Sequence, residues 1–425
     1  MSAEQSPFNW VYSVALCLVL LFGVFLRLPS PVFLPGGPLH GIHSLHPEAG
    51  FDGIGFDEGL YRKYVNSVIR EGLREYPIIV DHYIEVQQGL TGSILPPVRF
   101  LFILAAYLWH AMFGTEALEA LHDVAALFGI LTLFLATFFA WRLKGPLWAL
   151  GVAALMACAP TQIHMSQHAL VDGFFSFWAL LTVWLLWENL RRPRHSILLI
   201  LYTLSLALLV LTKENSFFVF VALLALIVAN RWLSFGSVTR ELITCTFVGP
   251  LLGAVVLVFL AGGIDTLLTT YRLSVTKNYA LNYAIMTGDG PWHRYLVDLL
   301  LVSPIVLLLA VGAISNLDRT KSTEWYLAIF VVASYAIMCN VKYGMNLRYA
   351  NMWDMPLRCL ALSQLLTWAA VLRRYQTAFV TTVVIAVCAF ELRQYVLLFV
   401  QHPLYELVTE GLLRALHILK SPGAL

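Results

Sequence analysis

Long apolar runs separated by short polar stretches recur along the chain from Trp10 almost to its C-terminus. A helix needs about 20 apolar residues to cross a hydrocarbon core about 30 Å thick. Runs that approach this length lie near residues 10–28, 124–141, 147–160, 173–190, 196–211, 216–230, 241–262, 295–314, 325–340, 356–372 and 377–399. The pattern therefore predicts an all-α polytopic membrane protein, with about eleven transmembrane helices in a single domain over residues 1–425.

Basic residues between the apolar runs give the expected orientation. They form five clusters, and each neighbouring pair of clusters leaves room for two apolar runs and a turn. Because basic residues in short loops stay on the cytoplasmic side, all five clusters are expected inside and the other polar stretches outside. The clusters are Arg142 with Lys144, Arg191 with Arg192 and Arg194, Arg231 with Arg240, Arg319 with Lys321, and Arg373 with Arg374.

Residues 98–113 (VRFLFILAAYLWHAMF) look apolar enough to cross the membrane, but a crossing conflicts with this orientation. If they crossed while the N-terminus lay inside, every basic cluster would face outward. We therefore predict a juxtamembrane or re-entrant helix within a large outer loop over residues 29–123. An N-terminus on the outside is the alternative that keeps this stretch as a span. Near the C-terminus, apolar positions at helical spacing predict an amphipathic surface helix over residues 403–420.

Composition supports a membrane chain and excludes several other classes of protein. Hydrophobic residues make up 59% of the sequence and charged residues only 12%, roughly half the charged share of a soluble domain. The basic residues are spread in pairs instead of forming one patch, so nucleic acid is not an expected partner. All six cysteines lie in or at the edge of apolar runs, which predicts neither a disulfide framework nor a cysteine zinc site.

The large outer loop contains the first candidate for chemistry, in GIGFDEGLYRKY. The glycines permit a turn and a helical pattern follows, so Asp57 falls near a helix N-terminus, with Tyr61 on its face. The helix dipole favours an ionised carboxylate there, which can accept a proton. The alternative is that Asp57 and Glu58 only cap the helix, as acids of the first turn commonly do.

A second polar interruption, APTQIHMSQHALVDGFFSFW, places His164, His168 and Asp172 at four-residue spacing. The three side chains would share one face if a helix continued through them. Ionisable groups at a membrane boundary usually face a polar cavity or one another. Two imidazoles and a carboxylate could also hold zinc, so these residues are weak candidates for a metal site beside the commoner interpretation of a satisfied polar pair.

Cations occur in three of the expected outer turns. Lys213 and Glu214 lie together in VLTKENSFF, Lys277 lies in YRLSVTKNY, and Arg348 lies in KYGMNLRY. Lys213 could form an interfacial ion pair with Glu214, or it could turn inward and hold a phosphate. Lys277 and Arg348 could likewise bind substrate or anchor the chain at the bilayer surface among membrane lipids.

Four segments, taken in order and with their separations, resemble the GT-C membrane glycosyltransferases. The resemblance is to the branch that contains the protein O-mannosyltransferases and the lipid A aminoarabinose transferase, and it covers roughly residues 10–230. It implies the GT-C fold, with a helix of the first outer loop lying along the membrane. The segments are FDEGLYRKY, ILPPVRFLFILAAYLWHAMFG, HALVDGFFSFW and LLVLTKENS.

The resemblance also implies roles for individual residues. Asp57 matches the general base that activates the acceptor, and Glu58 and Tyr61 match the rest of that motif. Asp172 matches the acid of the second outer loop, and Lys213 the basic residue of the following turn. His168 is a departure, because relatives often carry a basic residue shortly before the second acid.

The implied reaction is transfer of a hexosyl or pentosyl group from a polyprenyl-phosphate-linked donor to a hydroxyl acceptor, with inversion at the anomeric carbon. The acceptor could be a lipid, a glycan or a protein. Lys213, Lys277 and Arg348 are candidates to stabilise the leaving phosphate, and Glu58, Tyr61, His168, Asp172 and Glu214 to position sugar or acceptor. No cofactor is firmly implied, and a divalent metal remains an open alternative.

Two other classes of function remain open. A flippase or transporter would place charges near the membrane midplane, whereas the charged residues here are expected to collect at one face. A non-catalytic membrane subunit would tolerate Asp57→Asn. For location we expect the bacterial inner membrane with the site facing the periplasm; an endoplasmic reticulum location would keep the same geometry, with the lumen as the outer face.

Overall fold

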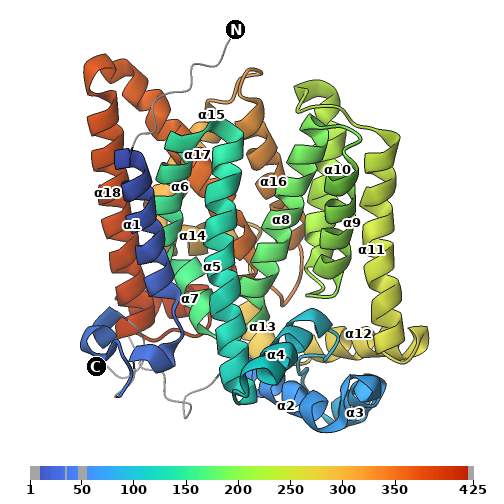
Figure 1. The fold of residues 1–425 in the computed structure, drawn as a ribbon. Coiled ribbons are helices and arrows are strands. Elements are labelled where there is room, and N and C mark those ends of the chain that lie inside the picture. Colours follow the sequence, from blue (N-terminus) through green and yellow to red (C-terminus); the bar gives the residue numbers. More distant parts are fainter. Residues whose placement is uncertain (1–9, 34–35, 46–54, 420–425) are drawn as a thin grey trace.

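The computed structural model describes residues 10–33, 36–45 and 55–419, and these residues contain helices but no strand. The longer helices run side by side as a bundle (Figure 1). They are α1 (Trp10–Arg27), α5 (Ala117–Lys144), α6 (Pro146–Ala157), α8 (Val171–Arg191), α9 (Ser196–Val210), α10 (Ser216–Leu233), α11 (Arg240–Leu260), α15 (Pro304–Ser315), α16 (Ser322–Met338), α17 (Asp354–Ala369) and α18 (Gln376–Tyr395).

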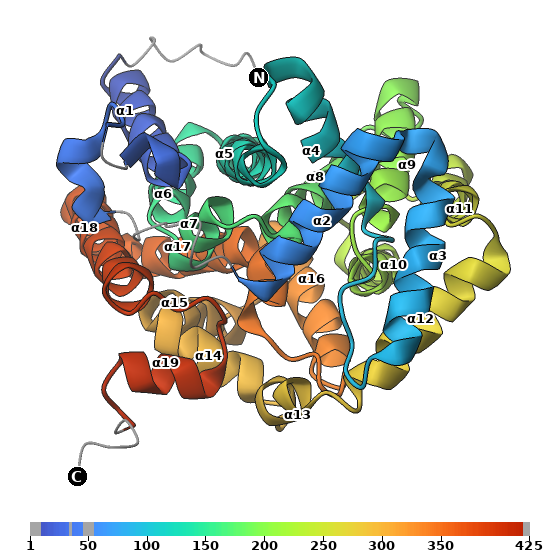
Figure 2. The same ribbon diagram turned by 90° about the horizontal axis from the view of Figure 1, so that it is seen from below.

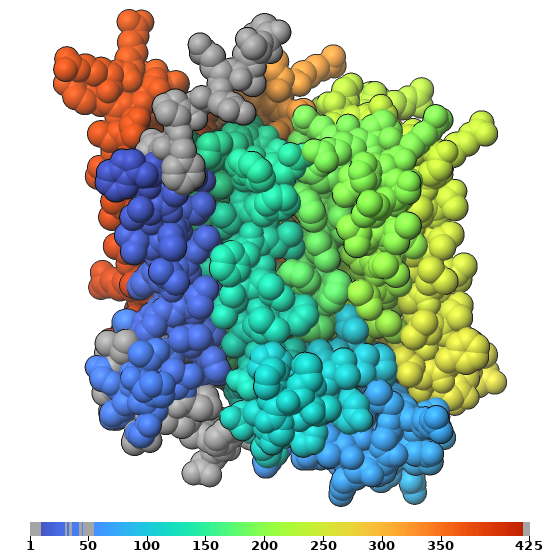
Figure 3. All heavy atoms as spheres, in the orientation of Figure 1, coloured from blue at the N-terminus to red at the C-terminus, as the bar shows by residue number. Residues whose placement is uncertain are grey.

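A layer of helices lies at one end of this bundle, and we call it the end layer (Figures 1 and 2). It consists of α2 (Phe56–Glu71), α3 (Tyr76–Gly89), α4 (Phe100–Phe113) and α12 (Ile264–Asn278). In the space-filling view, α2, α3 and α4 cover the lower end of the neighbouring bundle helices (Figure 3). Short helices complete the chain: α7 (Pro160–Gln167), α13 (Asn282–Gly288), α14 (Arg294–Val302), α19 (Thr409–Ala415), the 3₁₀ helix η5 (Leu347–Trp353) and a π-helical turn over Val396–Gln401.

The expectation that the apolar runs are helical is confirmed, apart from breaks at residues 158–159 and at Ser303. The lengths of the helices do not confirm the expected number of about eleven membrane-spanning helices. Among the described residues, six helical segments are long and apolar enough to cross a membrane, and the pair α6 and α7, bent by 59°, would be a seventh. One of the six, Leu347–Gln401, contains both α17 and α18, and four apolar helices are shorter. The run 295–314 is also broken, since Pro304 begins a new helix after Ser303 leaves the helical conformation.

Apolar side chains on the outer flank of the bundle explain why it needs a membrane. Leu18 on α1 is 62% exposed, and Phe259 on α11 is 77% exposed. The opposite side of α11 carries Gly249 and Gly253, whose missing Cβ atoms allow the backbone of α9 to approach closely. These helices therefore bury one face against their neighbours and leave the other for lipid.

Helix α4 covers most of the ambiguous stretch 98–113, and it lies in the end layer instead of running along the bundle (Figure 1). The N–H of Leu101 donates to the carbonyl of Leu211 over 2.9 Å, which fixes the start of α4 to the turn between α9 and α10. Gly114 ends the helix with a φ of 70°, a left-handed conformation that glycine adopts without strain.

The helix expected to continue through His164, His168 and Asp172 is interrupted. Helix α7 ends at Gln167, His168 and Leu170 have extended backbone, and α8 begins at Val171. The prediction that the three side chains share one helix face is therefore wrong. The new helix places Asp172 in the first turn of α8, apart from the two histidines.

The C-terminal segment forms less helix than its apolar pattern indicated. Of residues 403–419, only Thr409–Ala415 is α-helical, and position 420 of the expected helix lies outside the described residues. Pro403 cannot donate a backbone hydrogen bond, and the carbonyl of Leu407 accepts the N–H of Leu347 over 3.2 Å. Residues 402–408 therefore pack as an irregular strap against η5, with Leu407 fully buried.

Candidate active site

A single guanidinium, that of Arg348 in η5, brings together three carboxylates from distant parts of the chain. Nη2 of Arg348 donates to Oδ2 of Asp57 over 2.7 Å. Nε lies 3.5 Å from Oδ2 of Asp172, and Nη1 lies 3.1 Å from Oε1 of Glu406. The Arg348 side chain is only 6% exposed. We refer to these four residues together with Lys213 as the Arg348 cluster.

The contacts of Arg348 leave part of its donor capacity unused. Nε and Nη1 are close enough to carboxylates to form ion pairs, but neither makes a hydrogen bond of acceptable geometry in the described chain. Buried donors without an acceptor are uncommon in proteins, and they often mark a place where a ligand or water completes the site. A guanidinium edge is suited to two oxygen atoms of one phosphate or carboxylate.

Lys213 supplies a second buried cation to the cluster. Its Nζ lies 2.5 Å from Oδ1 of Asp172 and 3.8 Å above the ring centroid of Tyr349. Burial lowers the pKa of the Lys213 amine to about 8, with Arg99 and Arg348 adding to the decrease and Asp172 opposing it. Of the two alternatives for Lys213, the ion pair with Glu214 is wrong, because the turn between α9 and α10 directs the two side chains to different partners, and Lys213 turns inward to Asp172.

Glu214 pairs instead with Arg99, a residue that the sequence did not single out as part of the site. Nε of Arg99 donates to Oε2 of Glu214 over 3.2 Å, and Nη2 donates to Oε1. Nη1 of Arg99 donates to the hydroxyl of Tyr61 over 2.8 Å. Tyr61 is fully buried, and its ring packs edge-on against Phe102. These contacts tie α2, the start of α4 and the turn carrying Lys213 into one rigid unit.

Asp57 is the partly accessible carboxylate at the start of α2. Its side chain is 13% exposed, whereas that of Asp172 is 3% exposed. Arg348 binds Oδ2, and Oδ1 accepts no hydrogen bond from the described residues. The contact between Oδ2 and Arg348 thus holds the Asp57 side chain in place and leaves Oδ1 available.

Glu58, the next residue, is buried, and both of its carboxylate oxygens are bound by other parts of the chain. Oε1 accepts the N–H of Ala169 over 2.7 Å and lies 3.1 Å from Nδ1 of His168, while Oε2 accepts the N–H of Gly55 over 2.9 Å. Burial alone would raise the pKa of Glu58, but the hydrogen bond and charge of His168, together with His122 and the Gly55 N–H, lower it to about 2. Glu58 and His168 therefore join the start of α2 to the link between α7 and α8.

The remaining candidates from the sequence lie outside the Arg348 cluster. Lys277 is half-buried and donates to the carbonyls of Gln88 and Leu90, where it ties α12 to the end of α3. His164 is buried, its ring stacks on Phe399 with centroids 4.1 Å apart, and Nε2 lies 3.2 Å from the carbonyl of Tyr405.

The weak metal candidates His164, His168 and Asp172 have separate partners in the structure. Within residues 10–33, 36–45 and 55–419, no group of three His, Cys, Asp or Glu side chains is placed to hold a metal ion. The carboxylates of the Arg348 cluster instead face the guanidinium and the Lys213 amine. The donor set present in the described chain therefore does not fit a resident divalent cation.

A second polar network lies behind η5 and was not expected from the sequence. Arg358 donates to Oδ1 of Asp354 over 2.5 Å and to Oε2 of Glu391 over 2.7 Å. Nε2 of Gln162 donates to the carbonyl of Asn351 over 2.9 Å. Because Asn351 and Asp354 closely follow Arg348, this network fixes the segment that carries the site guanidinium.

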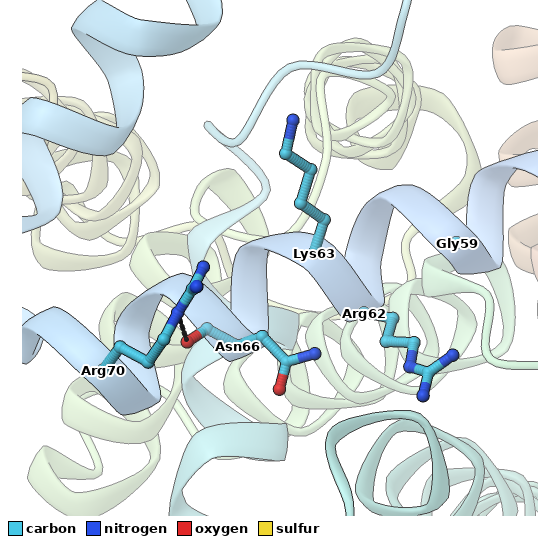
Figure 4. A pocket seen from close by; sticks show the side chains of 5 residues that line it. All are labelled: Gly59, Arg62, Lys63, Asn66 and Arg70. Carbon is cyan, nitrogen blue, oxygen red and sulfur yellow. Dashed lines mark hydrogen bonds between the residues drawn. The ribbon is translucent and has the colours of Figure 1, made fainter.

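A shallow basic groove of about 380 Å³ lies on α2, the helix whose first turn carries Asp57 (Figure 4). It is lined by Gly59, Arg62, Lys63, Asn66 and Arg70, which recur at helical spacing opposite the buried face of α2. Arg62 is partly neutralised, since its Nε lies 2.8 Å from Oε1 of Glu116. The groove gives the exposed face of α2 a positive charge.

Glu406 is the member of the cluster that reasoning from the sequence missed. The apolar pattern around Glu406 predicts a surface helix, and a charged side chain on such a helix is expected to face solvent. A signal was present in Pro403, which disfavours that helix, but nothing in the sequence connects position 406 with position 348.

One protein family matches part of the chain. Residues 119–271 match the family model of dolichyl-phosphate-mannose-protein mannosyltransferase. The match includes Asp172 and Lys213 but ends before Arg348 and Glu406 and begins after Asp57. No curated protein sequence matches the chain significantly.

Solved structures with a similar fold are membrane glycosyltransferases. The oligosaccharyltransferase of Archaeoglobus fulgidus aligns with a TM-score of 0.60 at 13% identity, over 92% of this chain and 57% of its own. ArnT from Cupriavidus metallidurans aligns with a TM-score of 0.52 at 14% identity, over 96% of this chain and 75% of its own. The chain thus spans a little over half the length of the archaeal enzyme.

These matches confirm the fold expected from the sequence motifs. The bundle of long helices and the end layer across one of its ends are the features that the solved structures share with this chain. The chain has the GT-C fold of membrane glycosyltransferases, and residues 119–271 carry the sequence pattern of the dolichyl-phosphate-mannose-protein mannosyltransferase family.

Proposed function

We propose that this protein transfers a sugar from a polyprenyl-phosphate carrier to a hydroxyl acceptor, with inversion at the anomeric carbon. The observation that carries the proposal is the Arg348 cluster, in which two buried cations and a partly free carboxylate lie at one end of a GT-C bundle. Among the structural neighbours, AglB has been solved with a dolichol-phosphate and ArnT with undecaprenyl phosphate. A lipid phosphate is therefore the donor group that this site is proposed to accept.

The proposed chemistry assigns the two cations to the leaving group. As the bond between the anomeric carbon and the phosphate oxygen breaks, its electron pair goes to the phosphate, which gains one negative charge. Lys213 and the unused edge of Arg348 can stabilise that charge in a site with little water. The prenyl chain would lie among the apolar helices, as other lipid chains do in membrane proteins.

Asp57 is the proposed general base. The acceptor oxygen forms a bond to the anomeric carbon on the face opposite the departing phosphate, and its proton passes to Oδ1 of Asp57. Oδ1 is suited to this role because no described residue donates to it, while the Arg348 contact holds the carboxylate in position. Asp172, paired with Lys213, would orient that amine toward the phosphate. No step is routed through a metal, because the carboxylates present are arranged around cationic side chains.

The proposed active face is the outer one. The turns that connect α5 to α6, α8 to α9, α10 to α11, α15 to α16 and α17 to α18 lie at the end of the bundle opposite the end layer (Figure 1). These turns carry the basic clusters, which the positive-inside rule places in the cytoplasm. The Arg348 cluster would then face the periplasm of a bacterial inner membrane.

The test is transfer by purified protein in liposomes with a panel of polyprenyl-phosphate sugars, including hexosyl and pentosyl donors. Release of polyprenyl phosphate from one donor, lost in Asp172→Asn and retained in Glu71→Gln, is the expected result. Glu71 is a matched control because it is an exposed carboxylate at the far end of α2. Equal turnover in Asp172→Asn would contradict the proposal, and transport of an uncleaved donor across the liposome would favour a flippase instead.

A further inference from the structure

Glu406 occupies one edge of the guanidinium to which the proposed function assigns the donor phosphate. We propose that Glu406 is a displaceable counter-ion: its carboxylate covers the Nη1 edge of Arg348 in the free protein and leaves that edge when a lipid phosphate binds. The inference rests on the proposed function, because it assumes that the ligand of Arg348 is a phosphate. It assigns a role to a residue outside the family segment 119–271.

The contact between Glu406 and Arg348 is close but incomplete. Nη1 lies 3.1 Å from Oε1 of Glu406, yet this nitrogen makes no hydrogen bond of acceptable geometry in the described chain. The other carboxylate oxygen, Oε2, accepts a hydrogen bond from Nδ2 of Asn346. Glu406 therefore has a second partner that can retain it when a better ligand takes Nη1. A phosphate can offer two oxygen atoms to one edge of a guanidinium. Glu406 offers only Oε1 to Arg348, because its Oε2 is bound to Asn346.

Glu406 is also the carboxylate of the cluster best placed to move. Its side chain is 19% exposed, compared with 13% for Asp57 and 3% for Asp172. Asp57 and Asp172 each lie in the first turn of a helix, whereas Glu406 lies on the irregular strap of residues 402–408. A side chain on irregular backbone at the edge of a site can change rotamer without disturbing a helix.

The strap itself is held on both sides of Glu406. The carbonyl of Tyr405 lies 3.2 Å from Nε2 of His164, and the carbonyl of Leu407 accepts the N–H of Leu347 over 3.2 Å. The fully buried side chain of Leu407 adds a packing anchor. The exchange therefore needs rotation of one side chain and no opening of the strap.

The charges of the cluster favour such an exchange. Asp57, Asp172 and Glu406 face two cations, Arg348 and Lys213. Adding a phosphate beside all three carboxylates would leave a large excess of negative charge in a buried place, which is costly. If Glu406 withdraws, two carboxylates remain against two cations, and the phosphate replaces the charge that has left.

The experiment measures binding of undecaprenyl phosphate to the purified full-length protein in detergent. We expect Glu406→Gln to bind it about 10-fold more tightly than wild type, which corresponds to about 1.4 kcal/mol. Glu410→Gln is the matched control, because Glu410 is an exposed carboxylate of the same segment that pairs with Arg414. Binding of undecaprenol, which lacks the phosphate, should not differ between wild type and Glu406→Gln.

The outcomes separate this inference from the proposed function. Tight binding by wild type that is unchanged or weakened in Glu406→Gln overturns the inference alone. Absence of binding by both wild type and Glu406→Gln overturns the inference together with the assignment of a lipid phosphate to Arg348. If Glu406→Gln proves unstable, Glu406→Asp is the second variant, because it keeps the charge but withdraws it by one methylene. Glu406→Asp should bind undecaprenyl phosphate about 3-fold more tightly than wild type. No increase in affinity in Glu406→Asp counts against the inference.

Discussion

Nη2 of Arg348 donates to Oδ2 of Asp57 over 2.7 Å, although 291 positions separate the two residues in the sequence. The contact joins the first turn of an end-layer helix to the 3₁₀ helix that precedes α17. It fixes the position of the proposed base relative to the cation that is proposed to bind the phosphate.

Replacing Arg348 with glutamine should destabilise the protein as well as abolish transfer. The change leaves three carboxylates around an uncharged side chain, and removal of one partner from a buried ion pair commonly costs about 3–5 kcal/mol. Thermal unfolding in detergent should show a clear loss, whereas Arg414→Gln, at an exposed ion pair of α19, should unfold like wild type. A normal unfolding temperature for Arg348→Gln would mean that the cluster is not charge-coupled as described.

Binding of a lipid phosphate should weaken as pH rises through about 8. Lys213 has its pKa lowered to about 8 by burial, so it is charged below that pH and loses its charge above it. The phosphate is already ionised in this range, so the change reports the amine. Affinity for undecaprenyl phosphate between pH 7 and 9.5 measures the effect. Lys213→Arg should remain charged and lose this pH dependence; the same decline in that variant would assign it to another group.

Acid should destabilise the protein through Glu58. Its folded pKa of about 2 lies below the ordinary value of 4.5, so its ionised form stabilises the fold above about pH 4.5. That contribution, of the order of 3 kcal/mol, is lost as pH falls toward 2. Unfolding temperatures between pH 6 and 3 should fall less steeply in Glu58→Gln than in wild type. The exposed-carboxylate variant Glu71→Gln should retain the wild-type slope, and an equally steep fall in Glu58→Gln would contradict the assignment.

The elements of the fold could be predicted from the sequence because membrane helices are encoded locally. A run of apolar residues between basic turns specifies a span without reference to the rest of the chain. The errors occur where one residue changes the backbone. Ser303 and Pro304 break an apolar run into α14 and α15, and Pro403 shortens the expected surface helix.

The site could be predicted only in part, because partner choice depends on tertiary structure. Lys213 and Glu214 are adjacent, and adjacency suggested an ion pair, but Asp172 and Arg99 are the partners that the fold brings to them. The family motifs directed attention to Asp57, Asp172 and Lys213. They gave no guide to Glu406, which reaches Arg348 from a strap outside any motif.

The central claim is that Asp57 removes the acceptor proton during sugar transfer. The most direct measurement is the rate of transfer at saturating donor for wild type, Asp57→Asn and Glu71→Gln, with binding of undecaprenyl phosphate measured on the same preparations. A general base contributes about 10²- to 10⁴-fold, so Asp57→Asn should lose at least 100-fold in rate while it still binds the carrier, and Glu71→Gln should match wild type. Transfer by Asp57→Asn at the wild-type rate would contradict the mechanism.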